Sequence, residues 1–251
     1  MRRALAFLTP IGGAVPPSAE AVRWFPFAGL VIGGATGVVW WGADQIWPPA
    51  VAAAVAVVAD LLLTGMLHLD GLVDSADGLL PPLPRGAASE SEGANGRPER
   101  ETSRERRLDV MADPAAGAFG VAAAISVLLL RLTALAAMSP APLLLAAVWS
   151  ASRTVMAWTI GAVPYARPGG LATAFMGPTT RVVAGGALLA VFVGVAGHGP
   201  KGALAVGAAF LAGVAVVQFA RRRIDGFTGD VLGAAGIVAE TVGLLVAAGR
   251  W

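Results

Sequence analysis

The hydrophobic positions of this chain form long, nearly uninterrupted runs, and the polar positions are confined to the stretches between them. Runs of about 18 to 22 apolar residues match the length that an α-helix needs to cross a bilayer core of about 30 Å. The pattern predicts an all-α fold, a polytopic integral membrane bundle of about seven transmembrane helices. The expected spans are approximately 24–42, 50–67, 117–138, 142–163, 182–198, 202–220 and 231–249.

The composition agrees with a membrane protein. Of the 251 residues, 56% are hydrophobic and only 14% are charged, whereas about a quarter of a soluble domain is usually charged. Cysteine is absent and there are two histidines, which excludes a disulfide framework, a thiolate metal site and a histidine cluster. Glycine and alanine fill many of the runs, as expected where helices approach closely in lipid.

The basic residues give the orientation. If the N-terminus is inside, the basic residues of the outside segments are Lys201 and Arg250 alone, and nearly all arginines fall in the inside segments. This asymmetry predicts a cytoplasmic N-terminus and an external C-terminus. The inside segments are then 1–23, 68–116, 164–181 and 221–230.

One inside segment differs from the rest of the chain. Residues 81–107 are rich in Pro, Gly, Ser, Glu and Arg and contain almost no large apolar residue. Such a segment buries too little surface to fold. We expect a mobile cytoplasmic loop at about 81–107 within a single membrane-embedded domain, 1–251.

The stretch HLDGLVDSADG follows the second apolar run and places Asp70, Asp74 and Asp77 at positions i, i+4 and i+7. On a helix these aspartates share one face. Three close carboxylates repel one another unless a cation neutralises them, and oxygen ligands favour a hard ion such as Mg²⁺ or Mn²⁺. The alternative is a polar helix face exposed to the cytoplasm.

A second acidic stretch, RRLDVMADPAAGAFG, precedes the third span and carries Asp109 and Asp113 four positions apart. Two acidic clusters at one membrane face resemble the carboxylate cradle of two-metal phosphoryl transfer. Asp113 also precedes Pro114, so it suits a helix cap. Capping and metal binding are compatible.

Several charges fall inside predicted spans, where they are costly and point to a functional site. Arg153 is a candidate to bind a phosphate, and Arg131 is a candidate partner for Asp60. A cation-coupled transporter that uses Asp60, Arg131 and Glu240 as midplane charges is a second hypothesis.

Five sequence blocks together resemble the cobalamin synthase family, the adenosylcobinamide-GDP ribazoletransferases. The blocks follow the family's order over nearly the whole chain, and FPFAGLVIGG in the first span agrees with it. The pattern HLDGL-x-D-x-x-DG is the most specific block. The five blocks are LLLTGMLHLDGLVDSADG, SRERRLDVMADPAAGAFG, Ser152–Arg153, PYARPGGL and FTGDVLGAA.

The resemblance implies a Mg²⁺-dependent, multi-pass enzyme of the bacterial cytoplasmic (inner) membrane, with its active site facing the cytoplasm. It would join adenosylcobinamide-GDP to α-ribazole or α-ribazole 5′-phosphate, giving adenosylcobalamin or its 5′-phosphate and GMP. The implied partners are these small molecules and the lipid bilayer, with no nucleic acid.

The resemblance also assigns residues. The implied metal ligands are Asp70, Asp74, Asp77 and Asp113. The implied catalytic residues are Asp74, His68 and Arg153, with the general base open between a carboxylate and His68. The implied substrate-binding residues are Arg153, Arg167, Thr228 and Asp230.

Some positions depart from the family pattern. The early stretch reads Thr-Pro-Ile-Gly at 9–12, and Ala112 and Ala115 stand where relatives often carry basic residues. A CDP-alcohol phosphotransferase is a further alternative, but its usual arginine is missing between Asp74 and Asp77.

Overall fold

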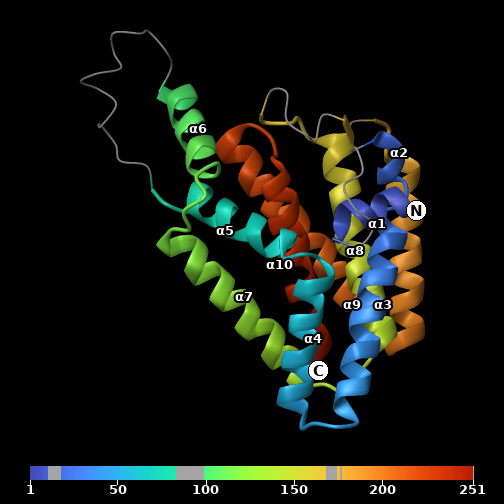
Figure 1. The fold of residues 1–251 in the computed structure, drawn as a ribbon. Helices are drawn as coiled ribbons and strands as arrows, with labels where there is room; N and C mark the ends of the chain where they lie inside the picture. Colours follow the sequence, from blue (N-terminus) through green and yellow to red (C-terminus); the bar gives the residue numbers. More distant parts are fainter. Residues whose placement is uncertain (11–17, 83–98, 168–173, 176, 251) are drawn as a thin grey trace.

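The protein is a bundle of helices, as the hydrophobic pattern predicts (Figure 1). The computed structural model describes residues 1–10, 18–82, 99–167, 174–175 and 177–250. Within these ranges the only β-type pairing is an isolated bridge between Tyr165 and Phe227. The helices are α1 (Arg2–Leu8), α2 (Ala19–Val22), α3 (Phe25–Asp44), α4 (Pro49–Leu63), α5 (Leu67–Leu79), α6 (Glu99–Val110), α7 (Ala118–Ala136), α8 (Pro142–Ala162), α9 (Thr180–Ile224) and α10 (Gly229–Ala248).

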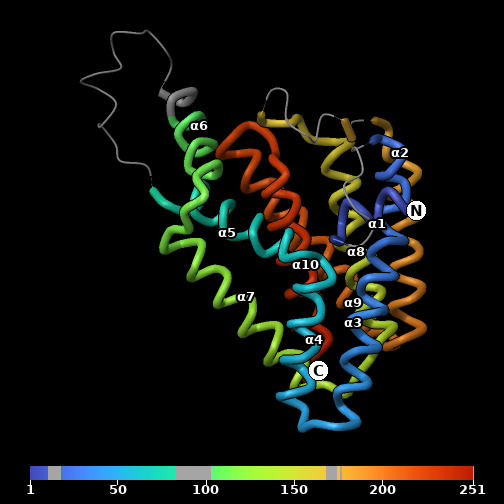
Figure 2. The backbone as a smooth tube through the Cα atoms, in the orientation of Figure 1, coloured from blue at the N-terminus to red at the C-terminus, as the bar shows by residue number. Residues whose placement is uncertain are grey.

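Counted one crossing per helix, the described residues give five or six crossings, fewer than the seven predicted. Among the described residues, five helices are individually long and apolar enough to cross a membrane: α3, α7, α8, α9 and α10. The pair α4 and α5 passes the same test together but is bent by 87°. Figure 2 shows the chain turning after α4, so that α5 runs across the bundle.

Helix α9 makes two crossings. Its 45 residues would extend about 68 Å as a straight helix, more than twice the bilayer core of about 30 Å. The helix breaks at His198 and Gly199, whose φ values are −150° and +59°. The two arms then fold together so closely that a methyl group on Gly202 would collide with the carbonyl oxygen of Gly194. Counting α9 twice and the bent pair α4–α5 once, the described helices are compatible with the seven predicted crossings.

The outer helices present large apolar side chains to their surroundings. On α7, Val121, Ile125 and Leu129 recur every fourth residue and are each about half exposed. Leu188 and Phe192 on α9 are 74% and 73% exposed at the same spacing. Such contiguous apolar faces are unfavourable in water, and they identify the surface that contacts lipid.

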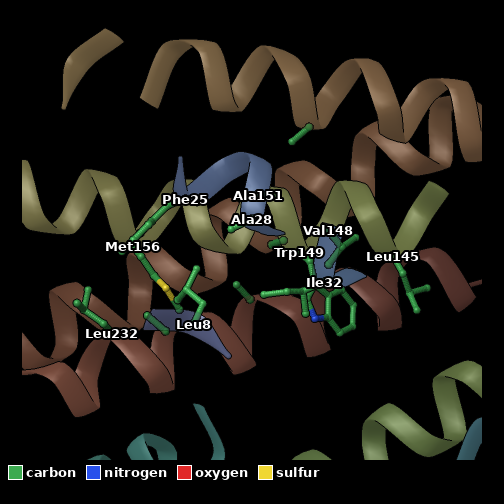
Figure 3. Packing of buried hydrophobic residues seen from close by; sticks show 14 of the residues in the cluster. Leu8, Phe25, Ala28, Ile32, Leu145, Val148, Trp149, Ala151, Met156 and Leu232 are labelled. Atoms are coloured by element: carbon green, nitrogen blue, oxygen red, sulfur yellow. The ribbon is translucent and has the colours of Figure 1, made fainter. Parts of the chain in front are cut away.

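The core is built around α8, which packs against α3, α9 and α10. Figure 3 shows Leu145, Val148 and Trp149 of α8 together with Ile32 of α3 in this core. Trp149 is 1% exposed although it is one of the largest side chains of the protein. Helix α8 therefore has almost no lipid-facing surface.

Glycines on α3 allow its close approach to α8. Gly29, Gly33 and Gly37 are spaced four residues apart, so they lie on one face of α3. A methyl group on Gly33 would collide with the carbonyl oxygen of Leu145, and each of the other two glycines also faces α8 backbone. This is the small-residue packing expected between transmembrane helices.

The predicted loop at 81–107 needs a correction in its last part, because α6 begins at Glu99. Arginines anchor this helix to its neighbours. Arg107 donates hydrogen bonds to the carbonyl oxygens of Gly78 (2.8 Å) and Leu79 (3.2 Å), and Arg104 donates to that of Ile224 (2.9 Å). Composition alone does not reveal such contacts. Residues 83–98 lie outside the described part of the chain.

The contact between α3 and α8 can be tested with two adjacent glycines. We expect Gly33→Ala to lower the free energy of unfolding by about 1–3 kcal/mol, the usual cost of overpacking. Gly34→Ala is the matched control, since the nearest atom to its new methyl group would be the Ala146 Cβ at 3.9 Å. Unfolding of both variants in detergent measures the difference. Equal stability of the two variants would contradict the packing described.

Candidate active site

A sharp bend carries the first acidic motif out of the bundle axis. Helix α4 ends at Leu63, and Gly65 and Met66 both adopt left-handed backbone conformations with φ of 57° and 59°. A left-handed methionine is uncommon, because its Cβ is crowded in this region. Helix α5 begins directly afterwards. It therefore turns away from the direction of α4 and runs toward α6 (Figure 1).

Helix α5 packs tightly on the start of α10. A Cβ on Gly71 would lie 2.6 Å from the carbonyl oxygen of Asp230. Asp230 is in the first turn of α10, and the side chain of Thr228 caps this helix by accepting a hydrogen bond from the Val231 backbone N–H at 3.3 Å. The acidic face of α5 and the N-terminus of α10 consequently meet.

What we call the acidic cluster consists of four carboxylates and one arginine: Asp70, Asp74, Asp77, Asp230 and Arg167. Burial, together with the negative charges of Asp230, Asp70 and Asp77, raises the pKa of Asp74 to about 6, against the opposing effect of Arg167. The Arg167 Nη2 lies 3.8 Å from an Asp230 carboxylate oxygen. One positive charge does not neutralise four negative ones, so the cluster is electrostatically suited to a cation.

Asp77 also joins α5 to α7. Its two carboxylate oxygens accept hydrogen bonds from the backbone N–H groups of Gly117 and Gly120, both at 2.8 Å. Gly117 is the N-cap of α7, which has no side-chain cap of its own. A methyl group on Gly120 would collide with the Asp77 carboxylate. Gly117 and Gly120, which belong to the second acidic motif, therefore leave space for the Asp77 side chain of the first motif.

A cavity of about 410 Å³ opens beside the acidic cluster, and we call it the aromatic cavity. Asp70, Arg167 and Asp230 are its charged lining residues, and His68 forms part of its wall. The remaining wall is largely apolar. It includes Phe7, Leu8, Phe25, Leu67, Met156, Ile160, Tyr165, Phe175 and Leu232.

The charges inside the spans pair with one another. Arg131 Nη2 lies 3.1 Å from Asp60 Oδ2 and 3.0 Å from Glu240 Oε2, which confirms the expected pairing of Arg131 with Asp60. The Trp149 indole donates a hydrogen bond to Asp60 at 2.8 Å. The Arg131 guanidinium lies 4.9 Å from the centre of the same indole ring.

The second buried arginine joins the same set, the intramembrane ion network. The Nη1 of Arg153 pairs with Glu240 Oε1, and Ser152 donates a hydrogen bond to this oxygen at 2.8 Å. The Nε and Nη2 of Arg153 have no hydrogen-bond partner within the described structure. A Cβ on Gly236 would lie 3.3 Å from His68 and 3.5 Å from Arg153, so Arg153 is close behind the cavity wall.

The structure brings most of the predicted site residues together. His68, Asp70, Arg167 and Asp230 share the aromatic cavity. Asp113 is exposed, and the contact described for it is local, a hydrogen bond from the Ala115 backbone N–H at 2.9 Å. Its metal-binding role stays a prediction.

Sequence reasoning missed three features of the site, in whole or in part. Asp230 was predicted to bind substrate, and this stays a prediction; that its negative charge also raises the pKa of Asp74 was not expected. Glu240 pairs with both buried arginines, which its isolated position in an apolar helix indicated only in part. The aromatic wall had no sequence signal, because its phenylalanines come from separate segments.

The acidic cluster has the type of ligand that a Mg²⁺ site needs, but it does not supply a complete set of ligands. Its donors are carboxylate oxygens, the ligands that Mg²⁺ prefers. Within the described residues, no three His, Asp or Glu side chains are grouped closely enough to hold a metal ion by themselves. Mg²⁺ usually keeps several waters and substrate phosphates as ligands, and this requirement fits a loose carboxylate set.

Comparison with known proteins decides the family. The profile described as cobalamin-5-phosphate synthase matches residues 1–88 and 96–248, nearly the whole chain. The chain belongs to the cobalamin-5-phosphate synthase family. No solved structure matches it significantly.

Two curated relatives match nearly the whole chain, and a third matches two thirds of it. A protein of Bradyrhizobium diazoefficiens named adenosylcobinamide-GDP ribazoletransferase is 36% identical over 99% of this chain and 92% of its own length. A protein of the same name from Roseiflexus sp. is 36% identical over 96% of this chain and 86% of its own. A third, from Thermosynechococcus vestitus, is 40% identical over 66% and 62%. Membership of the cobalamin-5-phosphate synthase family thus covers every helix that contributes to the site.

The ion network can be tested by restoring its charge balance. We expect Arg131→Leu to lower the free energy of unfolding by about 3–5 kcal/mol, since it leaves a buried carboxylate unpaired. Adding Asp60→Asn should recover part of the loss, because Glu240 and Arg153 then remain as a neutral pair. Tryptophan fluorescence during unfolding in detergent measures both variants.

Arg222→Leu is the control, because Arg222 is exposed, and it should change the stability little. A double variant no more stable than Arg131→Leu would show that charge balance is not what the network supplies.

Proposed function

We propose that the protein joins adenosylcobinamide-GDP to α-ribazole or α-ribazole 5′-phosphate in a Mg²⁺-dependent reaction. The products are adenosylcobalamin or its 5′-phosphate and GMP. The observation that carries the proposal is the acidic cluster, three of whose members, Asp70, Arg167 and Asp230, line the aromatic cavity, in a chain whose family relatives are named for this transfer.

Asp70, Asp74 and Asp77 are the proposed metal ligands, with Asp230 as a further carboxylate of the same cluster. When bound, Mg²⁺ supplies positive charge that neutralises the pyrophosphate and stabilises the leaving group. Asp113 stays a predicted ligand that would need the segment before α7 to approach the cluster. Arg167, held near Asp230, is placed to bind a phosphate oxygen beside the carboxylates.

The reaction exchanges a phosphoanhydride bond for a phosphate ester bond. A ribose hydroxyl of the ribazole attacks the phosphorus on the cobinamide side of the GDP bridge, and the bond from that phosphorus to the GMP oxygen breaks. His68 is the proposed acceptor of the hydroxyl proton, because it lines the cavity next to Asp70. Asp74, the other candidate base, is assigned to the metal.

The remaining predicted residues have supporting roles. Thr228 fixes the start of α10 by capping it, and thereby positions Asp230 for the substrate. Arg153 keeps two guanidinium nitrogens without a partner behind His68, and these are donors for a phosphate oxygen. Glu240 holds the third nitrogen.

The proposed orientation places the acidic cluster at the cytoplasmic face of a bacterial inner membrane. Arg104 and Arg107 of α6, Arg167 and the arginines that end α9 are all in predicted inside segments. Basic residues on one side are the strongest topological signal for a membrane protein. The nucleotide substrates would then reach the site directly from the cytoplasm.

The reaction is tested with the full chain in lipid nanodiscs. With adenosylcobinamide-GDP, α-ribazole and Mg²⁺, we expect equal amounts of GMP and cobamide, measured by chromatography and mass spectrometry. Removing Mg²⁺ with EDTA should stop turnover, and added Mg²⁺ should restore it. Asp74→Asn should lower kcat/KM at least about 100-fold, because it weakens binding of the cation whose charge stabilises the transition state.

Asp44→Asn, at the other end of α3 from the site, is the control and should keep normal turnover. Absence of GMP release by folded protein with either ribazole form would overturn the reaction. Undiminished turnover in EDTA, or in Asp74→Asn, would overturn the metal assignment alone.

A further inference from the structure

A second cavity, of about 400 Å³, lies between the starts of α3 and α9, where these two helices run side by side (Figure 1). We call it the interhelix groove. Its lining contains two arginines, and every other lining residue is apolar. The apolar residues are Pro26 and Phe27 of α3 and Val182, Gly185, Gly186 and Leu189 of α9.

Two adjacent glycines shape the groove. A Cβ on Gly186 would collide with the Thr154 hydroxyl and lie 2.7 Å from the Pro26 ring, so Gly186 allows α9 to pack closely against its neighbours. A Cβ on Gly185 would meet no atom within 4 Å. The groove is therefore closed by helix packing at Gly186 and open at Gly185.

The groove continues into the lipid-facing surface of the bundle. Phe27 is 44% exposed, and Val31, one turn further along α3, is 46% exposed. On α9 the exposed side chains beyond the groove are Leu188 and Phe192. All four side chains are apolar, so a hydrocarbon chain that begins in the groove can continue along this surface.

The two arginines lie at the end of the groove where both helices begin. Arg23 precedes α3, and Arg181 is in the first turn of α9. The Arg23 guanidinium lies 5.8 Å from the centre of the Trp24 ring, and tryptophan is typical of the membrane–water interface. The arginines are thus placed at the depth of lipid headgroups, with the apolar lining beyond them.

Positive charge exceeds negative charge at this end. Glu20 pairs with Arg23 at 2.5 Å and also lies 3.9 Å from Arg3, so a single carboxylate serves both arginines, and Arg181 adds a further positive charge at the groove. The Glu20 and Arg23 side chains are 58% and 55% exposed. An exposed ion pair contributes little to stability, so a phosphate can compete for Arg23.

We propose that the interhelix groove binds an anionic glycerophospholipid, with the phosphate between Arg23 and Arg181 and one acyl chain along Phe27 and Leu189. Guanidinium groups match phosphate oxygens in both charge and geometry, and basic pockets between transmembrane helices bind anionic lipid headgroups. The residues that line this groove and those that line the aromatic cavity do not overlap. The lipid site is therefore separate from the proposed reaction and does not depend on it.

Lipid binding is measured by native mass spectrometry on the full chain in detergent, with phosphatidylglycerol or phosphatidylethanolamine of the same acyl chains. We expect about tenfold tighter binding of phosphatidylglycerol, because only this lipid has a net negative charge. Arg23→Gln and Arg181→Gln should each weaken its binding about fivefold, since each removes one basic contact with the headgroup. Arg250→Gln is the matched control, because it removes the same charge from an exposed position outside the groove, and it should bind the lipid as the wild type does.

A second variant tests the apolar part of the groove with both arginines in place. Gly185→Leu should weaken phosphatidylglycerol binding at least about fivefold, because the new side chain fills the space of the acyl chain and excludes its apolar surface from the groove. Gly207→Leu, at another α9 position where a Cβ meets no atom within 4 Å, should leave binding unchanged. Circular dichroism during heating verifies that each variant is folded.

Three results would overturn the proposal. Wild-type binding of phosphatidylglycerol by folded Gly185→Leu would show that the arginines act only as surface charge. Equal binding of the two lipids by the wild-type protein would show that the groove does not select an anionic headgroup. Displacement of phosphatidylglycerol by an excess of glycerol phosphate would identify a site for a soluble anion, whereas retention of the lipid is the expected result.

Discussion

The structure depends on the mutual neutralisation of four charges buried inside the bundle. Asp60, Arg131, Arg153 and Glu240 come from α4, α7, α8 and α10 and are each less than 5% exposed. An isolated charge at this depth would be strongly unfavourable, so the four helices are stable together only in the register that pairs them. The same register fixes the position of α5, because this helix follows α4 directly and packs between α7 and α10.

The intramembrane ion network and the acidic cluster differ in the balance of their charges. The intramembrane ion network contains two positive and two negative charges, and its carboxylates are bound by arginine, tryptophan and serine donors. The acidic cluster contains four carboxylates and one arginine. Charge that is balanced in the bundle holds helices together, whereas unbalanced charge at the bundle end is available to a ligand. The midplane charges invoked by the transporter hypothesis belong to the balanced set.

Much of this arrangement follows from local sequence pattern. The apolar runs predict the spans, and the spacing of Asp70, Asp74 and Asp77 predicts a shared helix face, because both depend on helical geometry alone. The pairing of Asp60 with Arg131 was also expected, since a buried charge needs a partner. These predictions require no knowledge of how distant segments pack.

The remaining features depend on packing between distant segments. Asp230 approaches Asp74 only because α10 crosses α5 at Gly71. The left-handed Met66, which turns the acidic helix aside, occurs where glycine would be the usual choice. The convergence of phenylalanines from α1, α3 and the segment before α9 likewise has no periodic signal in the sequence.

The break in α9 limits how far its two arms can move apart. Only His198 and Gly199 separate the arms, and Gly194 and Gly202 approach each other closely beside this turn. The two arms therefore form a single helical hairpin, which can shift within the bundle only as a unit.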